Sequence, residues 1–600
     1  MNPIRTYYVD QSRRYAETVV QLRRRNRLFV VGELLTFILF LTLIALSTVV
    51  AGGRWILLPA VGALFGYTWI RMSDVRNDRR IRSMEDLHSV YEHEISYLDG
   101  DFTPFDAGAQ YLDPHHAFTY DLDIFGRDSL FQRMNRTITT GGSDRLASYL
   151  SFRRIHYQPE NIRAFAEDEL WRARFMSIGQ RRRIDSSGIC RVLTAASDVA
   201  VSRWLASPLT KAAAIMLIVG LLAAVVLAAE GTISVNLPIV WAIVQFFAVY
   251  TLTSKALRHI SKIMEGLHEQ MQQYIRMIRL CTEKEHVPAD LETAFGALRE
   301  ARISFERMEQ VIDGLDRRGN VMGLFLMDTF LLGDLFLIRR FIRWQQAYMD
   351  KIGGWIEIVS DVDALVSMGT FRYNEPATTE AEIVSGDTVI YEAEGLCHPF
   401  LGDKAVRNDF SISDRHFYII TGANMAGKST FLRSVGVNYV LALNGMPVFA
   451  RRLRVSRFRL FSSMRTNDDL SRGISYFNAE LLRLRQLIDF CEAPSAEAQD
   501  LPSTHTLIIL DEILKGTNSL DKLNGSRLFL DAISRLPVSG IVATHDLELS
   551  KMSERDSLRF HNFCFEIELG DRVTYSYRIT PGVARNQNAT FLLKGILAGR

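Results

Sequence analysis

Cysteine is scarce in this chain, with only five scattered copies in 600 residues. No two cysteines form a C-x-x-C pair, and none has a spacing to histidine that is typical of a metal site. A disulfide framework is therefore excluded, and we expect the globular parts to lie in the reducing cytosol. A strong charge of one sign is also missing, because the net charge is only +2. No global field recruits nucleic acid, so any basic surface must be local.

Internal repeats and long low-complexity tracts are absent as well, and the one Pro/Ala/Ser-rich loop of note covers residues 491–506. The chain is too long for one hydrophobic core and suggests three or four domains. The patterns described below predict a multidomain protein. It combines helical transmembrane hairpins, an α-helical region and a C-terminal α/β domain.

Apolar residues, by contrast, form long runs that predict two transmembrane hairpins, over residues 28–70 and 212–254. The run 28–50 is almost uninterrupted and, at 1.5 Å per residue, can cross a hydrocarbon core of about 30 Å. The run 55–70 is shorter and contains Pro59, so a re-entrant or interfacial helix is the alternative there. Both runs of the second hairpin are strongly apolar.

The distribution of Lys and Arg predicts how these hairpins are oriented. Basic residues precede the first span, follow the second and flank the second hairpin, whereas the two short links carry only Arg54. Because basic residues accumulate on the cytoplasmic side, both hairpins should enter and leave from the cytoplasm. The first span lies too far from Met1 to be a convincing secretory signal. We therefore expect a multi-pass protein of the inner (cytoplasmic) membrane, with lipid as a partner.

A fifth apolar run, residues 321–338, contains Asp328 and Asp334, which would be costly in lipid. A fifth crossing would also place the C-terminal domain outside the cell, so we predict a buried helix here. The expected domains are a cytoplasmic N-terminal segment, the two hairpins, two helical parts and an α/β domain. In chain order they cover 1–27, 28–70, 83–210, 212–254, 256–374 and 375–600.

The stretch "HFYIITGANMAGKSTFLRSV" runs from an apolar strand through G-x-x-x-x-G-K-[ST] into a helical pattern. This is the context in which that motif binds phosphate. Gly422 and Gly427 let successive backbone N–H groups turn toward one phosphate cluster, and the start of the helix adds to the positive field. Lys428 would reach the β- and γ-phosphates of ATP, and Ser429 would hold Mg²⁺. The predicted cofactor-binding residues of the loop are Gly422, Ala423, Asn424, Met425, Ala426, Gly427, Lys428, Ser429 and Thr430.

Two further strand ends carry candidate catalytic residues. "TLIILDEILKGT" predicts a buried strand ending in Asp511, which can orient the magnesium shell, and Glu512, which can polarise the attacking water. "GIVATH" predicts another strand ending in His545. A lone histidine is usually structural, but doubly wound sheets build their sites at the carboxyl ends of strands. We therefore expect His545 to sense the γ-phosphate.

Five stretches, "TGANMAGKSTFLRSVGVNYVLALNGMPVFA", "TNDDLSRGISYFNAELLRL", "LIILDEILKGTNSLDKLNG", "ATHDLEL" and "YRITPGVAR", resemble the ATPase domain of the MutS mismatch-repair family in order and spacing. The resemblance implies that the α/β domain is a P-loop ATPase domain of the ABC type and that the helical region is a core and lever domain. It further implies a homodimer in which Ser475 meets the γ-phosphate held by the partner's phosphate loop. It also implies that Asp521 helps to join the two sites. Asn424 matches the Asn of the family's loop. Residues 120–150 resemble the start of the MutS core and lever domain.

Some features depart from that family. The family's loop has Pro where this chain has Ala423, and "GRGTST" is replaced by "LKGTNS". A membrane hairpin takes the place of the mismatch-binding domain, and no Phe-x-Glu motif is visible. ATP hydrolysis is therefore expected, whereas mismatch recognition does not follow.

Three functions remain open at this point. The first is a membrane-anchored MutS-like ATPase that moves lever helices, on mismatched or branched DNA as the ancestry suggests. The second is a DNA-independent membrane remodelling or signalling ATPase. The third is an ABC-type transporter, which is disfavoured because the spans carry few interior polar residues.

Overall fold

The computed structural model describes residues 2–50, 53–155, 157–197, 203–264, 268–318, 321–465, 476–493, 499, 501, 503–569 and 573–585. Contacts divide the chain into two units. The helical unit comprises Met1–Gly100, Thr137–Ser143 and Glu169–Asp363. The sheet unit comprises Asp101–Arg136, Asp144–Asp168 and Ala364–Arg600. Much of the segment 83–210, which we predicted as one helical part, is therefore grouped by its contacts with the C-terminal α/β region.

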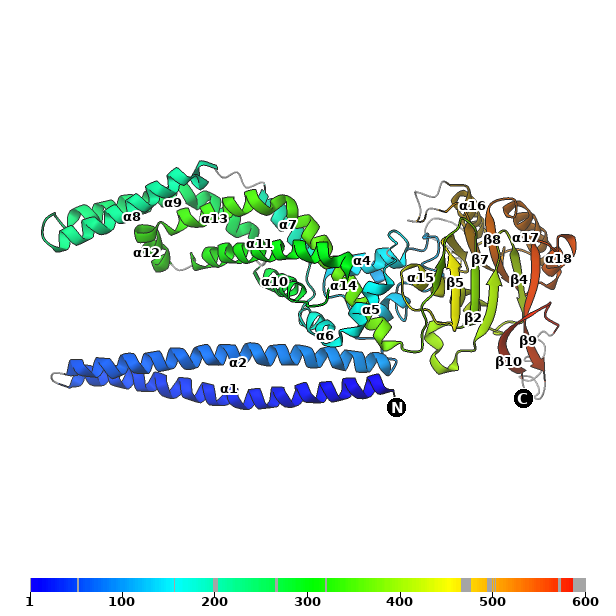
Figure 1. Cartoon of the computed structure of the whole chain (residues 1–600), viewed down its shortest axis with the longest axis horizontal. Helices are drawn as coiled ribbons and strands as arrows, with labels where there is room; N and C mark the ends of the chain where they lie inside the picture. The colour runs from blue at the N-terminus through cyan, green and yellow to red at the C-terminus, as the bar shows by residue number, and fades with distance from the viewer. Residues whose placement is uncertain are drawn as a thin grey trace. The chain divides into compact units, whose positions relative to one another are not determined.

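The N-terminal part of the helical unit is a pair of long helices, α1 (Pro3–Val49) and α2 (Leu57–Leu98), with η1 (Gly53–Ile56) before α2. The two helices lie side by side (Figure 1). Their polar halves are joined by an ion pair of 2.7 Å between Arg23 and Glu85, and Tyr15 stacks on Tyr91. The apolar half of α1 has no buried residue within its most hydrophobic window.

Among the described residues, three helices are long and apolar enough to cross a membrane: Pro3–Val49, Pro208–Ala229 and Asn236–Lys262. They are α1, α8 (Pro208–Ala229) and the larger part of α9 (Asn236–Met264). The apolar start of α2 is not among them, although it is helical and exposes Leu58, Phe65 and Trp69.

The run 321–338 forms two helices rather than the one that we predicted. They are α12 (Val321–Leu331) and α13 (Gly333–Tyr348), and the break falls at Leu332, whose φ of +52° is left-handed. Asp328 and Asp334 are buried, but Phe325, Met327, Phe330 and Leu331 of α12 are exposed, so the predicted burial of this run is only partly confirmed. The Asp328 carboxylate accepts the backbone N–H of Asp334 at 2.7 Å and thereby caps the start of α13. The break satisfies a buried acid that one continuous helix would leave without this donor.

The remaining helices of this unit are joined by aromatic and polar contacts. Tyr274 stacks on Phe305, which joins α10 to α11. Asp363 accepts the backbone N–H groups of Ile138 and Thr139 at 3.1 and 2.9 Å and ties the short segment 137–143 to α14. These elements are α6 (Glu169–Ser177), α7 (Ser186–Ser197), η3 (Arg203–Ala206), α10 (His268–Thr282), η4 (Ala289–Leu291), α11 (Glu292–Arg317), η5 (Met349–Lys351) and α14 (Ile352–Asn374).

The sheet unit contains a six-stranded sheet in the order β10-β9-β4-β8-β7-β6. All neighbours are parallel except the edge strand β10, which is antiparallel to β9. Strands β4 and β8 are buried along their whole length, as expected for a parallel sheet covered on both faces. The strands are β4 (Phe417–Gly422), β6 (Arg459–Ser463), β7 (Thr506–Asp511), β8 (Val538–Thr544), β9 (Phe560–Leu569) and β10 (Val573–Pro581). This confirms the predicted α/β region.

A smaller sheet, in the order β1-β5-β2-β3, precedes and interleaves with the larger one along the chain. Its strands are β1 (Glu382–Val384), β2 (Tyr391–Leu396), β3 (Asn408–Ile412) and β5 (Arg452–Ser456). The helices of the unit are η2 (Ala109–Tyr111), α3 (Leu130–Met134), α4 (Thr140–Leu150), α5 (Pro159–Glu167), η6 (Pro399–Lys404), α15 (Lys428–Leu443), α16 (Tyr476–Glu492), α17 (Ser519–Ile533), η8 (Leu547–Lys551) and α18 (Met552–Arg555).

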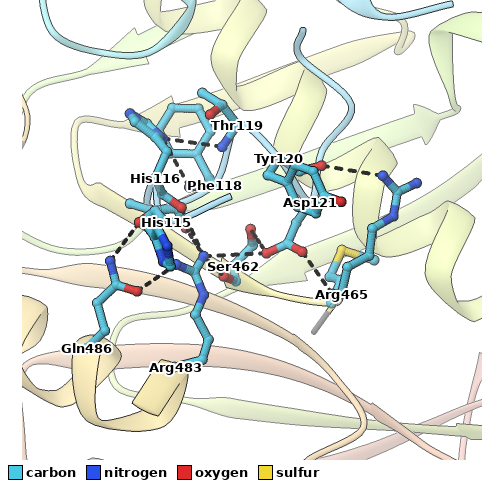
Figure 2. A network of polar contacts seen from close by, with 12 residues as sticks. His115, His116, Phe118, Thr119, Tyr120, Asp121, Ser462, Arg465, Arg483 and Gln486 are labelled. Atoms are coloured by element: carbon cyan, nitrogen blue, oxygen red, sulfur yellow. Dashed lines mark hydrogen bonds and ion pairs between the residues drawn. The ribbon is translucent and has the colours of Figure 1, made fainter. Parts of the chain in front are cut away.

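The segment 113–123 is fixed to the sheet unit by a buried polar network (Figure 2). Arg483 of α16 donates to the backbone carbonyls of Ser462, His116 and Ala117 at 2.7, 3.0 and 3.1 Å. Asp121, only 1% exposed, accepts the Ser462 hydroxyl at 3.0 Å and lies 3.5 Å from the Arg483 guanidinium. The network thus joins residues far apart in the sequence.

Candidate active site

The loop 422–427 connects β4 to α15 and requires glycine at two positions. A side chain at Gly422 would place its Cβ 3.0 Å from the backbone oxygen of Phe565. Gly427 has a φ of +106°, and a Cβ there would lie 3.0 Å from the ring of Tyr577. Met425 is also left-handed, with a φ of +69°, and its side chain is exposed. The backbone therefore turns tightly into the first turn of α15, where N–H groups are left without helical partners.

Lys428, the first residue of α15, is 7% exposed. Its ammonium donates to the backbone carbonyls of Gly422 and Ala423 at 2.7 and 3.0 Å. Burial lowers the pKa of Lys428, and the charges of Asp511 and Glu512 oppose that shift. A phosphate placed over the loop would compensate this buried charge.

Ser429 and Asp511 meet where α15 begins and β7 ends. The Ser429 hydroxyl donates to the Asp511 carboxylate at 2.5 Å. One hydroxyl and one carboxylate are the oxygen donors with which Mg²⁺ is commonly held when substrate phosphates and water supply the remaining ligands. The described residues contain no group of three or more His, Cys, Asp or Glu side chains that could hold a metal alone. The pair therefore fits Mg²⁺ as part of a metal–nucleotide complex.

Glu512 follows β7 directly and adopts a left-handed backbone with φ of +60°. Its carboxylate contacts the ring Nδ1 of His545, which follows β8, and accepts from the Lys522 ammonium of α17 at 3.3 Å. Burial alone raises the pKa of Glu512, but the hydrogen bond with His545 and the charge of Lys522 outweigh it, so the net shift is downward. The residue is therefore held as an ionised base at neutral pH.

These groups surround a pocket of about 750 Å³. Its lining includes Asn424, Met425, Ala426, Gly427, Lys428, Ser429, Thr430, Asp511 and Glu512. Gly422 and Ala423 lie behind it and hold Lys428, and His545 reaches it through Glu512. Asp521 does not line the pocket. It lies in the first turn of α17, where its backbone N–H donates to the cap residue Asn518. Ser475 lies outside the described residues.

Several lining residues were missed by the sequence reasoning. Lys515 and Phe565 belong to the pocket, and so does Tyr577, whose φ of +52° is left-handed. Asn408 of β3 fixes the strand around this tyrosine, because its side chain donates to the Tyr577 carbonyl at 3.1 Å and accepts the Ile579 N–H at 2.9 Å. Tyr577 lies within "YRITPGVAR", one of the stretches that carry the resemblance, but nothing local marks it as part of a site.

The strand, glycine loop and helix, together with the acidic end of β7, define an α/β domain with a site of the phosphate-loop type. Residues 418–591 match the family model of MutS domain V. Over these residues the chain thus carries a MutS domain V, in agreement with the resemblance seen in the sequence.

Curated relatives agree with that assignment. The DNA mismatch repair protein MutS of Aquifex pyrophilus is 30% identical over 245 residues, which cover 40% of this chain and 27% of the relative. That of Persephonella marina is 28% identical over 266 residues, covering 43% of this chain and 29% of the relative. That of Chloroflexus aurantiacus is 27% identical over 352 residues, which cover 57% of this chain and 31% of the relative. The chain thus spans less than a third of the length of these relatives.

Proposed function

We propose that the chain is a membrane-anchored, MutS-like ATPase that binds Mg²⁺–ATP in the pocket described above. The observation that carries the proposal is the convergence of the phosphate loop with Asp511 and Glu512 in one pocket. Membership of the MutS family in this region supports it. The helical lever would move when the ATPase domains close on ATP.

Each side chain then has a role that its surroundings support. Lys428 is a buried cation beside the loop and binds the β- and γ-phosphates. Ser429 and Asp511 hold the magnesium ion and its water shell, which supplies charge neutralisation during phosphoryl transfer. Glu512 orients and deprotonates the attacking water, and His545 keeps Glu512 in place through its hydrogen bond. The loop residues Asn424 and Thr430 complete the phosphate cradle.

The remaining wall of the pocket suits the base and sugar of the nucleotide. It is apolar and partly aromatic, which favours stacking and burial of a purine ring. The residues on this wall are Leu396, Leu401, Val406, Phe565 and Tyr577.

The site is proposed to be completed by a second copy of the chain. Ser475 would contact the γ-phosphate bound by the partner, and Asp521 would help to join the two sites. The exposed position of Asp521 at the start of α17 supports this role, since a surface residue can meet a second chain. Mixing Ser475→Ala chains with Lys428→Ala chains should restore one active site per heterodimer. No recovery of activity would contradict a composite site.

The proposal of membrane anchoring is based on α1, α8 and α9. No described part of the chain fully covers the apolar surfaces of these helices. Leu28, Val49 and Leu209 are 72%, 81% and 82% exposed, which is unfavourable in water and favourable in lipid. We place the ATPase domain in the cytoplasm.

The test of the function is ATP hydrolysis by the full chain purified in detergent, alone and with homoduplex, mismatched or branched DNA. We propose DNA as the partner because the relatives in the comparison are DNA mismatch repair proteins. Stimulation by mismatched or branched DNA would support this. Hydrolysis that is indifferent to all three DNA forms would instead support a remodelling or signalling ATPase.

A further inference from the structure

The helical unit contains a second large cavity, far along the chain from the phosphate loop. Its volume is about 1020 Å³, and it is lined by residues of α1, α2, α6, α10 and α11. Nothing in the proposed ATPase reaction uses it. Arginine is the dominant side chain of its wall, and the helices contribute Arg79 from α2, Arg174 from α6 and Arg276 from α10.

Most of the charges in the cavity wall neutralise one another. The ion pairs are Arg71 with Asp74, Arg82 with Asp78, Arg181 with Asp86, Arg279 with Glu306 and Glu283 with Arg302.

Three exposed arginines of the wall, Arg79, Arg174 and Arg276, form no ion pair among the described residues. Burial raises the pKa of Asp86, and the charge of Arg276 is one of those that oppose this shift. Only one lining carboxylate, Glu309, is similarly without a partner. Three guanidinium groups from three different helices therefore face one cavity with an excess of positive charge. Guanidinium groups bind phosphate oxygens through paired hydrogen bonds, so this wall selects an anion of that kind.

The same cavity contains two buried acceptors without a donor in the described part of the chain. They are Oε1 of Gln273 and Oδ1 of Asp74, whose residues are 9% and 7% exposed. A buried acceptor left without a hydrogen bond costs about 1–3 kcal/mol, so a bound hydroxyl group would be favoured here. Neither oxygen is accessible in the structure, so the two side chains would have to turn toward the ligand on binding. Inorganic phosphate carries no carbon-bound hydroxyl group that could extend from the arginines to these acceptors.

We propose that this cavity binds a phosphorylated polyol, whose phosphate pairs with Arg79, Arg174 and Arg276 and whose hydroxyl groups donate to Gln273 and Asp74. The ligand is either a soluble polyol phosphate or the headgroup of a lipid such as phosphatidylglycerol, since both carry a phosphate and neighbouring hydroxyls. The lipid source draws on the membrane anchoring proposed above. Arg71, at the edge of the cavity, directly follows the apolar start of α2, and Trp69 beside it is 67% exposed, as is common at a membrane–water boundary.

The first test measures binding of glycerol 3-phosphate and of inorganic phosphate to the full chain in detergent, by calorimetry. Replacing the three unpaired arginines together (Arg79→Gln, Arg174→Gln, Arg276→Gln) should weaken glycerol 3-phosphate binding at least about tenfold, since charge-assisted hydrogen bonds are lost. The matched control removes the same charge from exposed arginines outside the cavity (Arg24→Gln, Arg76→Gln, Arg80→Gln) and should leave binding unchanged.

A single substitution tests the hydroxyl contacts separately. Gln273→Leu should leave inorganic phosphate binding intact and remove the preference for glycerol 3-phosphate over inorganic phosphate. The lipid arm uses nanodiscs of phosphatidylcholine with or without phosphatidylglycerol, and native mass spectrometry counts the phosphatidylglycerol retained by wild type and by the arginine variant. Retention that depends on the three arginines identifies the lipid as the source, whereas binding of the soluble probe alone identifies a free metabolite.

The proposal is overturned if neither arm detects binding, if the control variant loses as much affinity as the cavity variant, or if Gln273→Leu keeps the preference. Lys428→Ala must leave glycerol 3-phosphate binding unchanged, because its loss would mean that the probe occupies the phosphate loop. These measurements do not involve ATP, so a failure of the ATPase would be seen separately. An unchanged helical circular dichroism spectrum and thermal midpoint show that the cavity variant is folded.

Discussion

At the scale of single residues, Glu512 is held in place by groups from two neighbouring elements. His545 follows β8 and Lys522 lies on α17, and both contact the same carboxylate. The left-handed backbone at Glu512 is a strained conformation for a residue with a Cβ, and such strain is commonly retained where a side chain must be aimed at a reaction. The carboxylate is thereby kept ionised and directed into the pocket.

Substituting Glu512→Gln should abolish steady-state hydrolysis, because the amide cannot accept a proton from water. We expect a loss of at least about 10²-fold in kcat, in the range typical for removing a general base. ATP binding should persist, so bound ATP should accumulate on the variant in a single-turnover assay. Normal turnover by the purified variant would remove Glu512 from this role.

The pH dependence of hydrolysis should change when the positive charge of Lys522 is removed, because this charge lowers the pKa of Glu512. Because the pKa of Glu512 is lowered, the active carboxylate persists below the ordinary value of 4.5 and is lost only as the pH falls further. Lys522→Gln removes a positive charge that lowers this pKa, so the pKa should rise. The acid limb of the profile of kcat/KM against pH should therefore move to higher pH.

A matched control for this shift is Lys551→Gln. Lys551 is an exposed lysine that pairs with Glu548 at 2.8 Å. Its replacement changes the net charge equally but should leave the acid limb where it is. Equal shifts in the two variants would mean that Lys522 acts only through the overall charge.

At the scale of secondary-structure elements, the sheet unit depends on a segment that is remote in sequence. Arg483 of α16 donates to four backbone carbonyls, three of them in the segment 113–123, and faces the buried Asp121 (Figure 2). Arg465, which follows β6, adds a bidentate ion pair with Asp123 at 2.6 and 3.0 Å. Arg433 of α15 donates to the Asp121 carbonyl at 3.0 Å, so the helix that begins at the phosphate loop is joined to the same segment.

Replacing Arg483→Met should destabilise the sheet unit by about 3–5 kcal/mol, because it leaves the Asp121 carboxylate buried without its cationic partner. Thermal unfolding of the full chain, followed by circular dichroism, should show a lower midpoint for this variant. Arg485→Met serves as the control, since Arg485 is 80% exposed and pairs weakly with Asp489. If both variants unfold at the wild-type midpoint, the network does not stabilise the unit.

The elements that the sequence predicted best are those with local signals. The glycine spacing, the apolar strand before it and the helical pattern after it were sufficient to predict the loop 422–427 and Lys428. Asp511 and Glu512 were predictable because an apolar strand ends at them. Tyr577 was not predictable, because its position in the pocket depends on the pairing of β9 with β10 and on the hydrogen bond from Asn408.

Two features of the fold could not be predicted from the sequence either, because they depend on specific polar contacts that leave no periodic pattern. The break at Leu332 depends on the hydrogen bond between Asp328 and the backbone of Asp334, which no apolar period indicates. The membership of residues 101–136 in the sheet unit depends on ion pairs such as that of Asp121 with Arg483, whose partners are hundreds of residues apart. Long-range pairing of this kind leaves no periodic trace in one sequence.

In the complete chain, the α/β domain that holds the pocket is connected to helices whose apolar surfaces are unsuited to water. The turn between α8 and α9 contains Gly231, and Arg451 is an exposed residue of the sheet unit. If both ends of this hairpin are cytoplasmic, the turn must face the opposite side of the membrane.

A cysteine introduced at the turn (Gly231→Cys) should react with a membrane-impermeant maleimide applied to intact cells. The matched substitution Arg451→Cys should react only after the membrane is permeabilised, and so should the native Cys190. Labelling is read by mass spectrometry of the purified chain. Reaction of Arg451→Cys in intact cells would reverse the proposed topology.

We infer above that the pocket formed by the phosphate loop and the acidic end of β7 binds Mg²⁺–ATP. Titration of the purified full chain with ATP and magnesium, in parallel with the Lys428→Ala variant, tests this directly. We expect saturable binding by the wild-type chain and binding at least about tenfold weaker by the variant, because a buried phosphate–lysine contact is removed. Absence of magnesium-dependent ATP binding by the wild-type chain, or equal affinity in the two proteins, would contradict it.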